Sequence, residues 1–238
     1  MAYRHEATKL LKKGHTLYEI VKKLNRTIYA VIDDLQRQAG EGDLKLSEIF
    51  FAIPPDKRAT LESLIEGNPA SDLSSLQKLA GQQGFTWYEL DLYHRLRNPR
   101  IFRGDMYEYI ADIEVALHTL VRTLLVKEFG PAETQWWRQG VPLPIRRDCV
   151  QTREEDPDPV DDDFAYTTLI HLAEIIERHW PSLSRILPAP LAKDKKSFLK
   201  NLRRLNTIRN AVMHPVKGKS WGREDFEFVR ELHRLICA

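Results

Sequence analysis

The sequence has few cysteines, no long apolar run and little net charge. Among 238 residues only Cys149 and Cys237 are cysteines, which excludes a disulfide framework and a cysteine-based zinc site and favours a reducing compartment. No stretch of about 18 apolar residues occurs, so we expect no membrane span. Residues 1–20 lack the apolar core that signal peptides have. We therefore expect a cytoplasmic protein that needs neither a metal nor another cofactor.

Charge is nearly balanced over the whole chain but not along it. The 36 Lys and Arg residues exceed the 34 Asp and Glu residues by two. Residues 154–163, EEDPDPVDDD, hold seven of the carboxylates and two prolines, a composition typical of a solvated acidic loop. Removing these seven leaves 27 acidic residues, and nine of the basic residues lie within 193–219. Near-neutrality therefore does not exclude a nucleic-acid partner, and the acidic loop is a candidate to screen the basic segment.

The spacing of apolar residues predicts a mainly α protein, because helical periodicity runs almost throughout and alternating β-branched runs are nearly absent. No internal repeat at a fixed period is apparent. In the first part Leu44 and Leu46 flank Lys45 in a predicted short strand. Asn98-Pro99 and Gly104 mark a boundary between domains 1–100 and 105–238. The helices predicted in the first domain cover residues 4–13, 17–24, 28–39, 56–66 and 72–83.

Two of these helices are joined by a tight polar turn, as in a helix-turn-helix. Thr16 and Thr27 are expected to cap them, Asn25-Arg26 makes the turn, and residues 40–46 fit a small wing. The segment from Thr8 to Ile53 resembles the helicase-associated helix-turn-helix near the C-terminus of RecQ-type helicases, and residues 75–97 look like the tail of that module. The matching residues are Gly14, Thr16, Glu19, Ile20, Thr27, Ile28, Val31, Leu35 and Gly42.

This resemblance implies an N-terminal unit that binds DNA or docks a partner protein. Besides Arg26 in the turn, the exposed positions of the third helix offer Tyr29, Gln36 and Arg37 as DNA contacts. Asp33 and Asp34 lie on the same helix and count against this use, because a carboxylate near phosphate is repelled by about 1 kcal/mol. Both partners therefore stay open.

The second part predicts a four-helix bundle with long helices over 105–128, 164–180, 194–213 and 223–236. Between the first two of these helices we expect a short segment around Trp136-Trp137 and then a proline-rich acidic loop. The basic helix 194–213 ends in RNAVMHP, which contains Arg209, Asn210 and His214. Pro215 favours an end of the helix at His214, from which His214 is expected to turn back toward Arg209.

An Arg–His pair suits the cleavage of RNA. A histidine that titrates near pH 6.5 can accept or donate a proton, and a permanently charged guanidinium can hold a phosphate by two hydrogen bonds. The same residues also suit a simpler structural role, with a capping His214 and a surface Arg209. Spacing alone favours that simpler reading.

From Tyr107 to the C-terminus the chain resembles HEPN domains, of the kind appended to a eukaryotic RNA-surveillance endonuclease. The match lies in residues 113–125, 164–180 and 198–215. The resemblance implies a helical bundle that dimerises and an Arg–polar–His motif that cleaves RNA without metal. Carried over, Arg209 is the phosphate clamp, His214 the general acid or base and Asn210 an orienting residue, with Glu114 in a weaker supporting role.

Other residues are secondary candidates for contact with RNA. Basic side chains before Arg209 are expected to guide RNA to the site, and tryptophans can stack on bases, although packing is the more frequent role of a tryptophan. His118 and His171 are expected to be ordinary members of bundle helices. The RNA-binding candidates are Lys196, Lys200, Arg203, Arg204, Trp136, Trp137 and Trp221.

The sequence thus favours a HEPN-type endoribonuclease, homodimeric and recruited by its helix-turn-helix to nucleic acid or to a protein, in defence or stress response. The alternative is a non-catalytic DNA-binding regulator or adaptor that dimerises through the bundle. A third reading, a component of a defence or toxin–antitoxin system, differs in that activity requires a partner protein.

Overall fold

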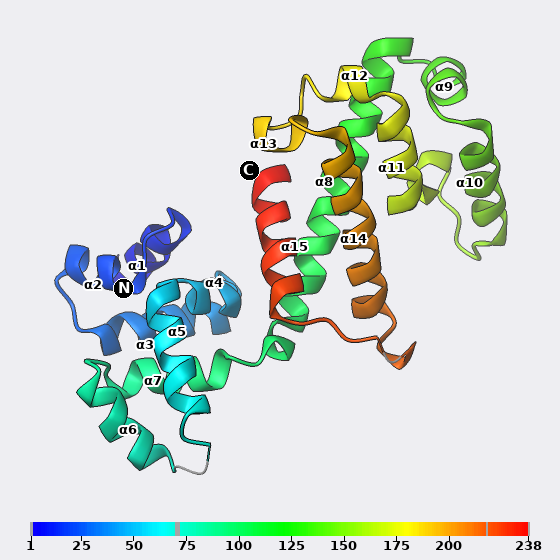
Figure 1. Ribbon diagram of the computed structural model, residues 1–238. Coiled ribbons are helices and arrows are strands. Elements are labelled where there is room, and N and C mark those ends of the chain that lie inside the picture. The colour runs from blue at the N-terminus through cyan, green and yellow to red at the C-terminus, as the bar shows by residue number, and fades with distance from the viewer. Residues whose placement is uncertain (1, 70–71, 218, 238) are drawn as a thin grey trace. The chain divides into compact units, whose positions relative to one another are not determined.

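Helices form all the regular structure of the described chain. A computed structural model describes residues 2–69, 72–217 and 219–237, and within these ranges it contains no strand (Figure 1). The predicted mainly α class is therefore confirmed. Within the same ranges no helix is long and apolar enough to span a membrane. Contacts between Cα atoms divide the chain into two compact units, residues 1–105 and 106–238.

The first unit consists of short helices, four of which begin at a threonine or aspartate cap. The side-chain oxygens of Thr16, Thr27 and Thr86 each accept a hydrogen bond from the amide three residues later, which satisfies a donor that the first turn leaves free. The predicted helices are confirmed to within two residues. The elements are α1 (Ala2–Lys12), α2 (Leu17–Leu24), α3 (Ile28–Gly40), α4 (Leu46–Phe51), α5 (Pro55–Glu66), α6 (Leu73–Gln82), α7 (Trp87–Leu96) and η1 (Pro99–Phe102).

The strand and wing predicted around Lys45 are wrong, because α4 begins there. The carboxylate of Glu48 accepts the amide hydrogen of Lys45 at 2.8 Å, so the chain is closed into a helical turn instead of an extended one. Ser47 and Phe50 of this helix are buried three residues apart, as on one face of a helix. The Leu–Lys–Leu pattern therefore belongs to the start of a helix here. An alternation of apolar and polar residues over three positions is too short to distinguish a strand from a helix start.

One seven-residue pattern starts both α2 and α7, a repeat that apolar periodicity did not indicate. Residues 14–20 read GHTLYEI and residues 84–90 read GFTWYEL. Each begins at a glycine with positive φ, +86° at Gly14 and +80° at Gly84, which a glycine adopts without strain. In both copies the glutamate carboxylate accepts the amide hydrogen of the capping threonine at 2.8 Å. The first unit therefore uses the same helix–turn–helix entry twice.

The helices of the first unit pack in two groups. α1, α2 and α3 contact one another, as do α5, α6 and α7, and α3 and α4 also contact α7. The turn between α2 and α3 consists of residues 25–27, with Asn25 in the left-handed conformation at φ 50°. Asparagine tolerates this conformation better than most residues, so the tight polar turn predicted from the sequence is present.

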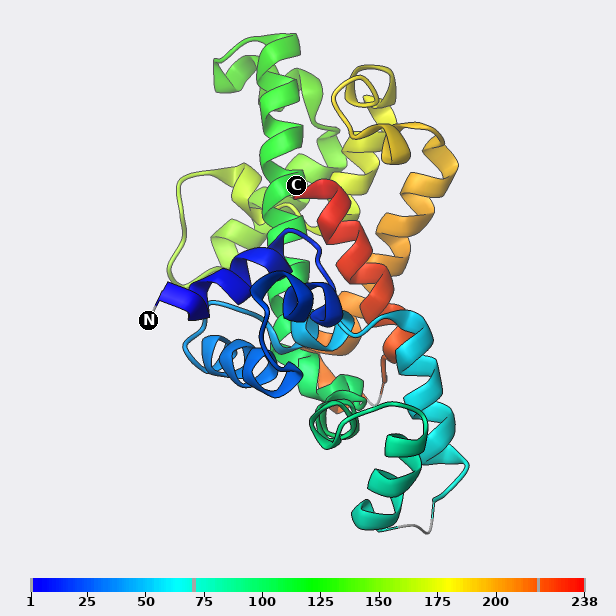
Figure 2. The same ribbon diagram turned by 90° about the vertical axis from the view of Figure 1, so that its left-hand side faces the viewer.

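The second unit is arranged around α8, which runs its length with α14 and α15 alongside (Figures 1 and 2). Tyr109 of α8 packs edge-on against Phe226 of α15, with ring centroids 6.0 Å apart, and α11 packs against α14. The elements are α8 (Arg103–Phe129), α9 (Glu133–Gln135), the π turn η2 (Trp136–Gly140), α10 (Leu143–Glu155), η3 (Asp163–Tyr166), α11 (Leu169–Arg178), α12 (Trp180–Leu183), α13 (Ala189–Ala192), α14 (Lys195–Met213), η4 (Pro215–Lys217) and α15 (Arg223–Ile236).

Two predictions between α8 and α14 are wrong. The region expected to be a proline-rich loop contains α10, since its prolines stand at Pro142 before the helix and at Pro144 in the first turn, where no intrahelical bond is lost. The helix predicted from residue 164 begins instead at Leu169, because the hydroxyl of Thr168 caps it there. The spacing of apolar residues indicated that this region is helical, whereas the residues at Pro142 and Thr168 determine where α10 and α11 begin.

The acidic segment 154–163 forms ion pairs and hydrogen bonds with residues of α8, α10 and η3. Its first two residues end α10 and its last starts η3. Asp162 pairs with Arg122 of α8, Asp163 lies 2.8 Å from Arg153, and Asp156 accepts the hydroxyl hydrogen of Tyr166 at 2.9 Å. In the described ranges none of its carboxylates pairs with α14. The segment therefore forms no ion pair with the basic helix within these ranges, and the hypothesis that it screens this helix stays a prediction.

Candidate functional site

The Arg–His motif lies at the C-terminal end of α14, where Pro215 ends the helix. Pro215 disfavours helical geometry at the residue before it, and His214 accordingly has φ −123° and ψ 64°. The amide of His214 still donates to the carbonyl of Asn210 at 3.1 Å. The backbone of His214 is therefore still bound to the last helical turn, while its side chain is exposed to solvent.

Arg209 is held by a neighbouring helix and by its own. Its Nε donates to Oε1 of Glu114 on α8 at 3.2 Å, and its Nη1 donates to Oδ1 of Asn210 at 3.5 Å. The side chains of Arg209 and Glu114 are 36% and 28% exposed. An ion pair with this exposure contributes about 0–1 kcal/mol, so a phosphate can compete with Glu114 for the guanidinium.

Hydrogen bonds bring Arg209, Asn210 and Glu114 together. Within the described residues no side chain hydrogen-bonds the imidazole of His214. The expected return of His214 toward Arg209 therefore stays a prediction. Five residues of helix correspond to a rise of about 7.5 Å, which leaves room between the two side chains for a phosphate group.

The basic residues of α14 lie on other sides of the helix than Arg209. At about 100° per residue, Lys200 is half a turn away from Arg209, and Lys196 and Arg203 are more than 100° away. Lys196, Lys200, Arg203 and Arg204 are all exposed. The structure therefore does not gather these four around the Arg209 site.

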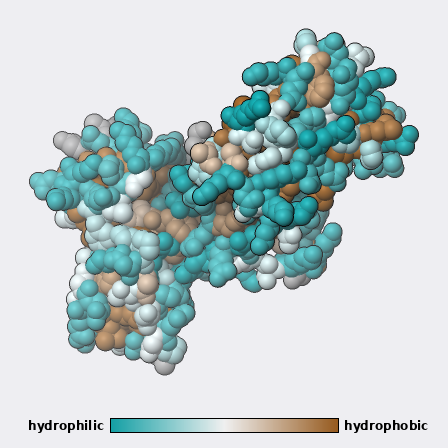
Figure 3. Space-filling view, turned by 45° about the horizontal axis from the view of Figure 1, so that its top comes forward, coloured by the Kyte–Doolittle hydropathy of each residue, from teal (hydrophilic) through white to brown (hydrophobic). Residues whose placement is uncertain are grey.

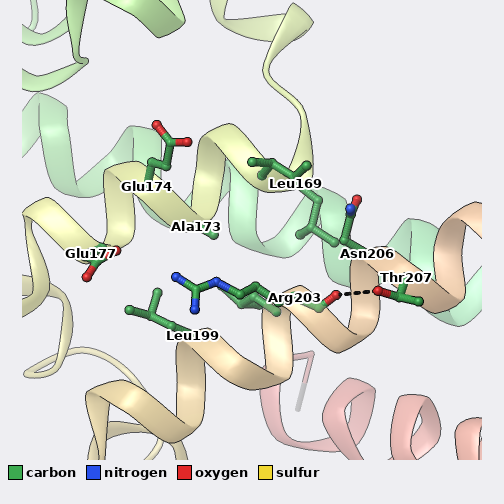
Figure 4. Close-up of a pocket in the computed structure, with 10 residues that line it drawn as sticks. Leu169, Ala173, Glu174, Glu177, Leu199, Arg203, Asn206 and Thr207 are labelled. Atoms are coloured by element: carbon green, nitrogen blue, oxygen red, sulfur yellow. Dashed lines mark hydrogen bonds between the residues drawn. The ribbon is translucent and has the colours of Figure 1, made fainter.

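Arg204 and Arg203 have local partners instead. Arg204 donates to Asp225 of α15 at 2.9 Å, and its guanidinium lies 4.3 Å from the centroid of the Phe228 ring. Arg203 lines a groove between α11 and α14, with Leu199 beside it and Glu177 across from it (Figure 4). The groove also contains Glu174, so its two carboxylates outnumber its single cation and do not favour an anionic ligand.

The candidate DNA contacts of the first unit are largely engaged within α3 and its turn. Arg26 forms an ion pair with the buried Asp34, and Arg37 pairs with Asp33 at 2.9 Å. The two aspartates therefore neutralise the arginines that were expected to reach DNA. Tyr29 remains 48% exposed, and its ring lies 4.4 Å from that of Tyr88.

The remaining aromatic and histidine candidates have structural partners. Trp136 and Trp137 are 4% and 6% exposed and pack edge-on against Phe164. Trp221 is half-buried and stacks on Phe226 at 6.3 Å. His118 lies 2.9 Å from the carbonyl oxygen of Phe164 through Nε2, and His171 accepts the amide hydrogen of Thr168 at 3.3 Å through Nδ1.

Sequence reasoning missed a half-buried histidine between α11 and α12. His179 lies 2.7 Å from the carbonyl oxygen of Gly140 through Nε2 and 3.3 Å from Glu128 through Nδ1. These partners lie 39 and 51 positions away in the chain, so no local pattern indicated them. In the described parts of the chain no three His, Cys, Asp or Glu side chains are grouped to bind a metal.

Comparisons of this chain with known protein families, curated proteins and solved structures gave no match. The function is therefore argued from the residues and their geometry.

Proposed function

We propose that the protein is a metal-independent endoribonuclease of HEPN type. The observation that carries the proposal is the end of α14, where Arg209 is oriented by Glu114 and Asn210 and the exposed His214 follows one turn later. The resemblance of residues 107–238 to HEPN domains supplies the reaction class. Arg209 binds the scissile phosphate and His214 transfers protons.

The reaction is an attack of a ribose 2′-hydroxyl on the adjacent phosphorus. A base removes the hydroxyl proton, the 2′-oxygen bonds to phosphorus, and the bond to the 5′-oxygen of the next nucleotide breaks as an acid protonates that oxygen. The products are a 2′,3′-cyclic phosphate and a 5′-hydroxyl. Arg209 stabilises the charge that develops on the non-bridging oxygens, since its guanidinium can donate two parallel hydrogen bonds to them.

One histidine cannot be base and acid in the same step, which is why the proposal includes a homodimer. A second copy of the chain would bring a second His214 to the phosphate. The exposure of His214 and its freedom from side-chain partners within the described chain agree with such a role. The first unit recruits the bundle to nucleic acid or to a protein, and Tyr29 with Tyr88 is its most exposed aromatic surface.

The alternative is a non-catalytic adaptor that binds phosphate or nucleotide groups without cleaving them. The observation that favours it is the pairing of Arg209 with Glu114 in the single chain, together with the lack, among the described residues, of a side-chain hydrogen bond to His214. In that case the bundle serves for dimerisation, and the first unit binds DNA or a partner.

Cleavage of labelled RNA in the presence of EDTA distinguishes the two. We expect the wild type to release fragments with cyclic phosphate ends, and His214→Ala and Arg209→Ala to lose at least about a hundredfold in rate. Arg185→Ala, which removes an exposed arginine from the loop before α13, is the matched control and keeps full activity. Cleavage that survives both substitutions refutes the assignment of these residues.

An inert wild type that still binds RNA supports the adaptor. Molecular mass measured at several protein concentrations tests the dimer, and a monomer at all concentrations contradicts the two-histidine mechanism.

A further inference from the structure

The second unit contains another candidate binding site, where the π turn η2 meets α10. We call it the Trp–Arg groove. It has a volume of about 520 Å³, within the range of small-molecule sites. Its elements differ from those of the Arg209 site. The groove is lined by Trp137, Arg138, Leu143, Arg146, Arg147 and Val150, with Glu133, Thr134, Gln151 and Asp163 completing it.

The π turn that forms one wall is tightly anchored. A Cβ added to Gly140 would lie 2.7 Å from Cδ2 of Leu125 and 3.1 Å from Cδ2 of Phe129, so any larger residue at this position would require these two side chains of α8 to shift. His179, which also contacts Glu128, binds the carbonyl oxygen of Gly140 at 2.7 Å. Single π turns are frequent at functional sites, and this one sets the backbone positions of Trp137 and Arg138.

The groove carries an excess of positive charge, since three arginines line it against the two carboxylates of Glu133 and Asp163. In the described parts of the chain no carboxylate forms an ion pair with Arg138, Arg146 or Arg147. Arg146 donates its Nε to the carbonyl oxygen of Val141 at 3.1 Å, which leaves its two terminal nitrogens to other acceptors. Asp163 is already bound by Arg153 at 2.8 Å. Three guanidinium groups in one groove repel one another, and an anion between them removes the repulsion.

The groove also offers apolar contact and an accessible donor. Leu143 and Val150 are 47% and 38% exposed, which is high for leucine and valine. Hydrophilic residues cover most of the surface face shown in Figure 3. Trp137 is 6% exposed, and its indole N–H has no acceptor within the described residues. This nitrogen is not among the buried unpartnered polar atoms of the described residues, so the donor is open to solvent and can bind a ligand acceptor.

We propose that the Trp–Arg groove binds a nucleotide, either free or as one unit of a single-stranded RNA. The phosphate binds the guanidinium groups of Arg138 and Arg147, and the base lies against Leu143 and Val150 and accepts the indole hydrogen of Trp137. A nucleotide fits both features of the groove, because its base can lie on the apolar side chains and its phosphate can bind the arginines. The proposal is independent of cleavage at Arg209.

The test measures binding to the full-length protein by fluorescence anisotropy with two probes. One is a fluorescent analogue of adenosine monophosphate, and the other is a short labelled RNA with 2′-O-methyl riboses, which lacks the attacking hydroxyl. The test variant is Arg138→Gln with Arg147→Gln. Its matched control is Arg178→Gln with Arg185→Gln, which removes the same charge from two exposed arginines outside the groove.

We expect the test variant to bind at least about tenfold more weakly, because each lost charge-assisted hydrogen bond contributes more than a factor of ten. For RNA, the slope of log affinity against log salt falls by about 0.7 for each phosphate that the variant no longer neutralises. Weakening of both probes supports a site that accepts either form, weakening of the RNA alone identifies the strand, and weakening of the mononucleotide alone identifies the free nucleotide.

Two results overturn the proposal. One is a wild type that binds neither probe, and the other is a control variant that weakens binding as much as the test variant. His214→Ala keeps the two proposals separate, since it is expected to abolish cleavage and leave nucleotide binding at the groove unchanged. Thermal unfolding of each variant checks that the exposed substitutions leave the fold intact.

Discussion

Replacement of Glu114 by glutamine tests whether Arg209 binds phosphate. Glu114→Gln keeps the size of the side chain and an oxygen that can accept the Nε hydrogen of Arg209, now 3.2 Å from Oε1. It removes only the negative charge. If Arg209 is the phosphate clamp, the carboxylate of Glu114 and the phosphate compete for one cation, and the substitution must strengthen the binding of RNA.

The size of the effect follows from distance and exposure. A phosphate on the far side of the guanidinium lies about 6 Å from the Glu114 carboxylate, and at an effective dielectric constant of about 50 the repulsion is about 1 kcal/mol. Its removal raises affinity about fivefold. The free energy of unfolding changes by less than about 1 kcal/mol, since the two side chains are 36% and 28% exposed.

The assay is the dissociation constant of the uncleavable 2′-O-methyl RNA, measured at low and at physiological salt. Glu231→Gln is the control, because it removes a carboxylate that pairs with Arg234 on α15 and changes the net charge by the same amount. An affinity equal to that of Glu231→Gln, or lower than that of the wild type, refutes the placement of phosphate on Arg209. Arg209 would then serve to attach α14 to α8.

Two further predictions concern packing and pH. Gly140→Ala is expected to lower the free energy of unfolding by about 1–3 kcal/mol, because the new Cβ meets Leu125 and Phe129. Gly81→Ala has open space around it and is expected to raise the free energy of unfolding by about 0.5–1 kcal/mol. Unfolding in urea measures both variants, and equal effects of the two substitutions contradict the close approach at Gly140. Burial, followed by the charges of Asp163 and Asp148, raises the pKa of Cys149 from 9.0 to about 11, so the folded state holds this proton more tightly and loses stability as pH rises from about 9 to about 11. Between about pH 8 and pH 10.5 the wild type should lose about 2 kcal/mol more than Cys149→Ala, and parallel curves for the two proteins argue against a buried thiol.

Local sequence signals predicted most helices correctly. Thr16, Thr27 and the apolar periodicity of α14 and α15 fixed helix starts and buried faces without reference to the rest of the chain. The failures occurred where two local signals competed. Around Lys45 a short alternation resembled a strand, and between Pro142 and Glu155 prolines at permitted first-turn positions concealed α10.

The partners of the charged residues could not be derived from the sequence. Asp34 was expected to repel phosphate and instead neutralises Arg26, and the acidic segment 154–163 pairs with Arg122 and Arg153 instead of α14. An ion pair forms only where two charged side chains come within about 4 Å, and that distance depends on how the chain turns between neighbouring helices, as for Arg26 and Asp34, or on how separate elements pack, as for Arg122 and Asp162.

The sequence by itself determined that the chain is helical, where most helices begin, and that Arg209, Asn210 and His214 stand within one turn and a half of each other. Tertiary structure decided what those residues can do. It placed Glu114 of α8 against Arg209, paired Arg204 of α14 with Asp225 of α15, and brought the π turn beside α10 to form the Trp–Arg groove. The reason is that helical periodicity is a local property, whereas the set of charges around a side chain depends on how separate helices pack.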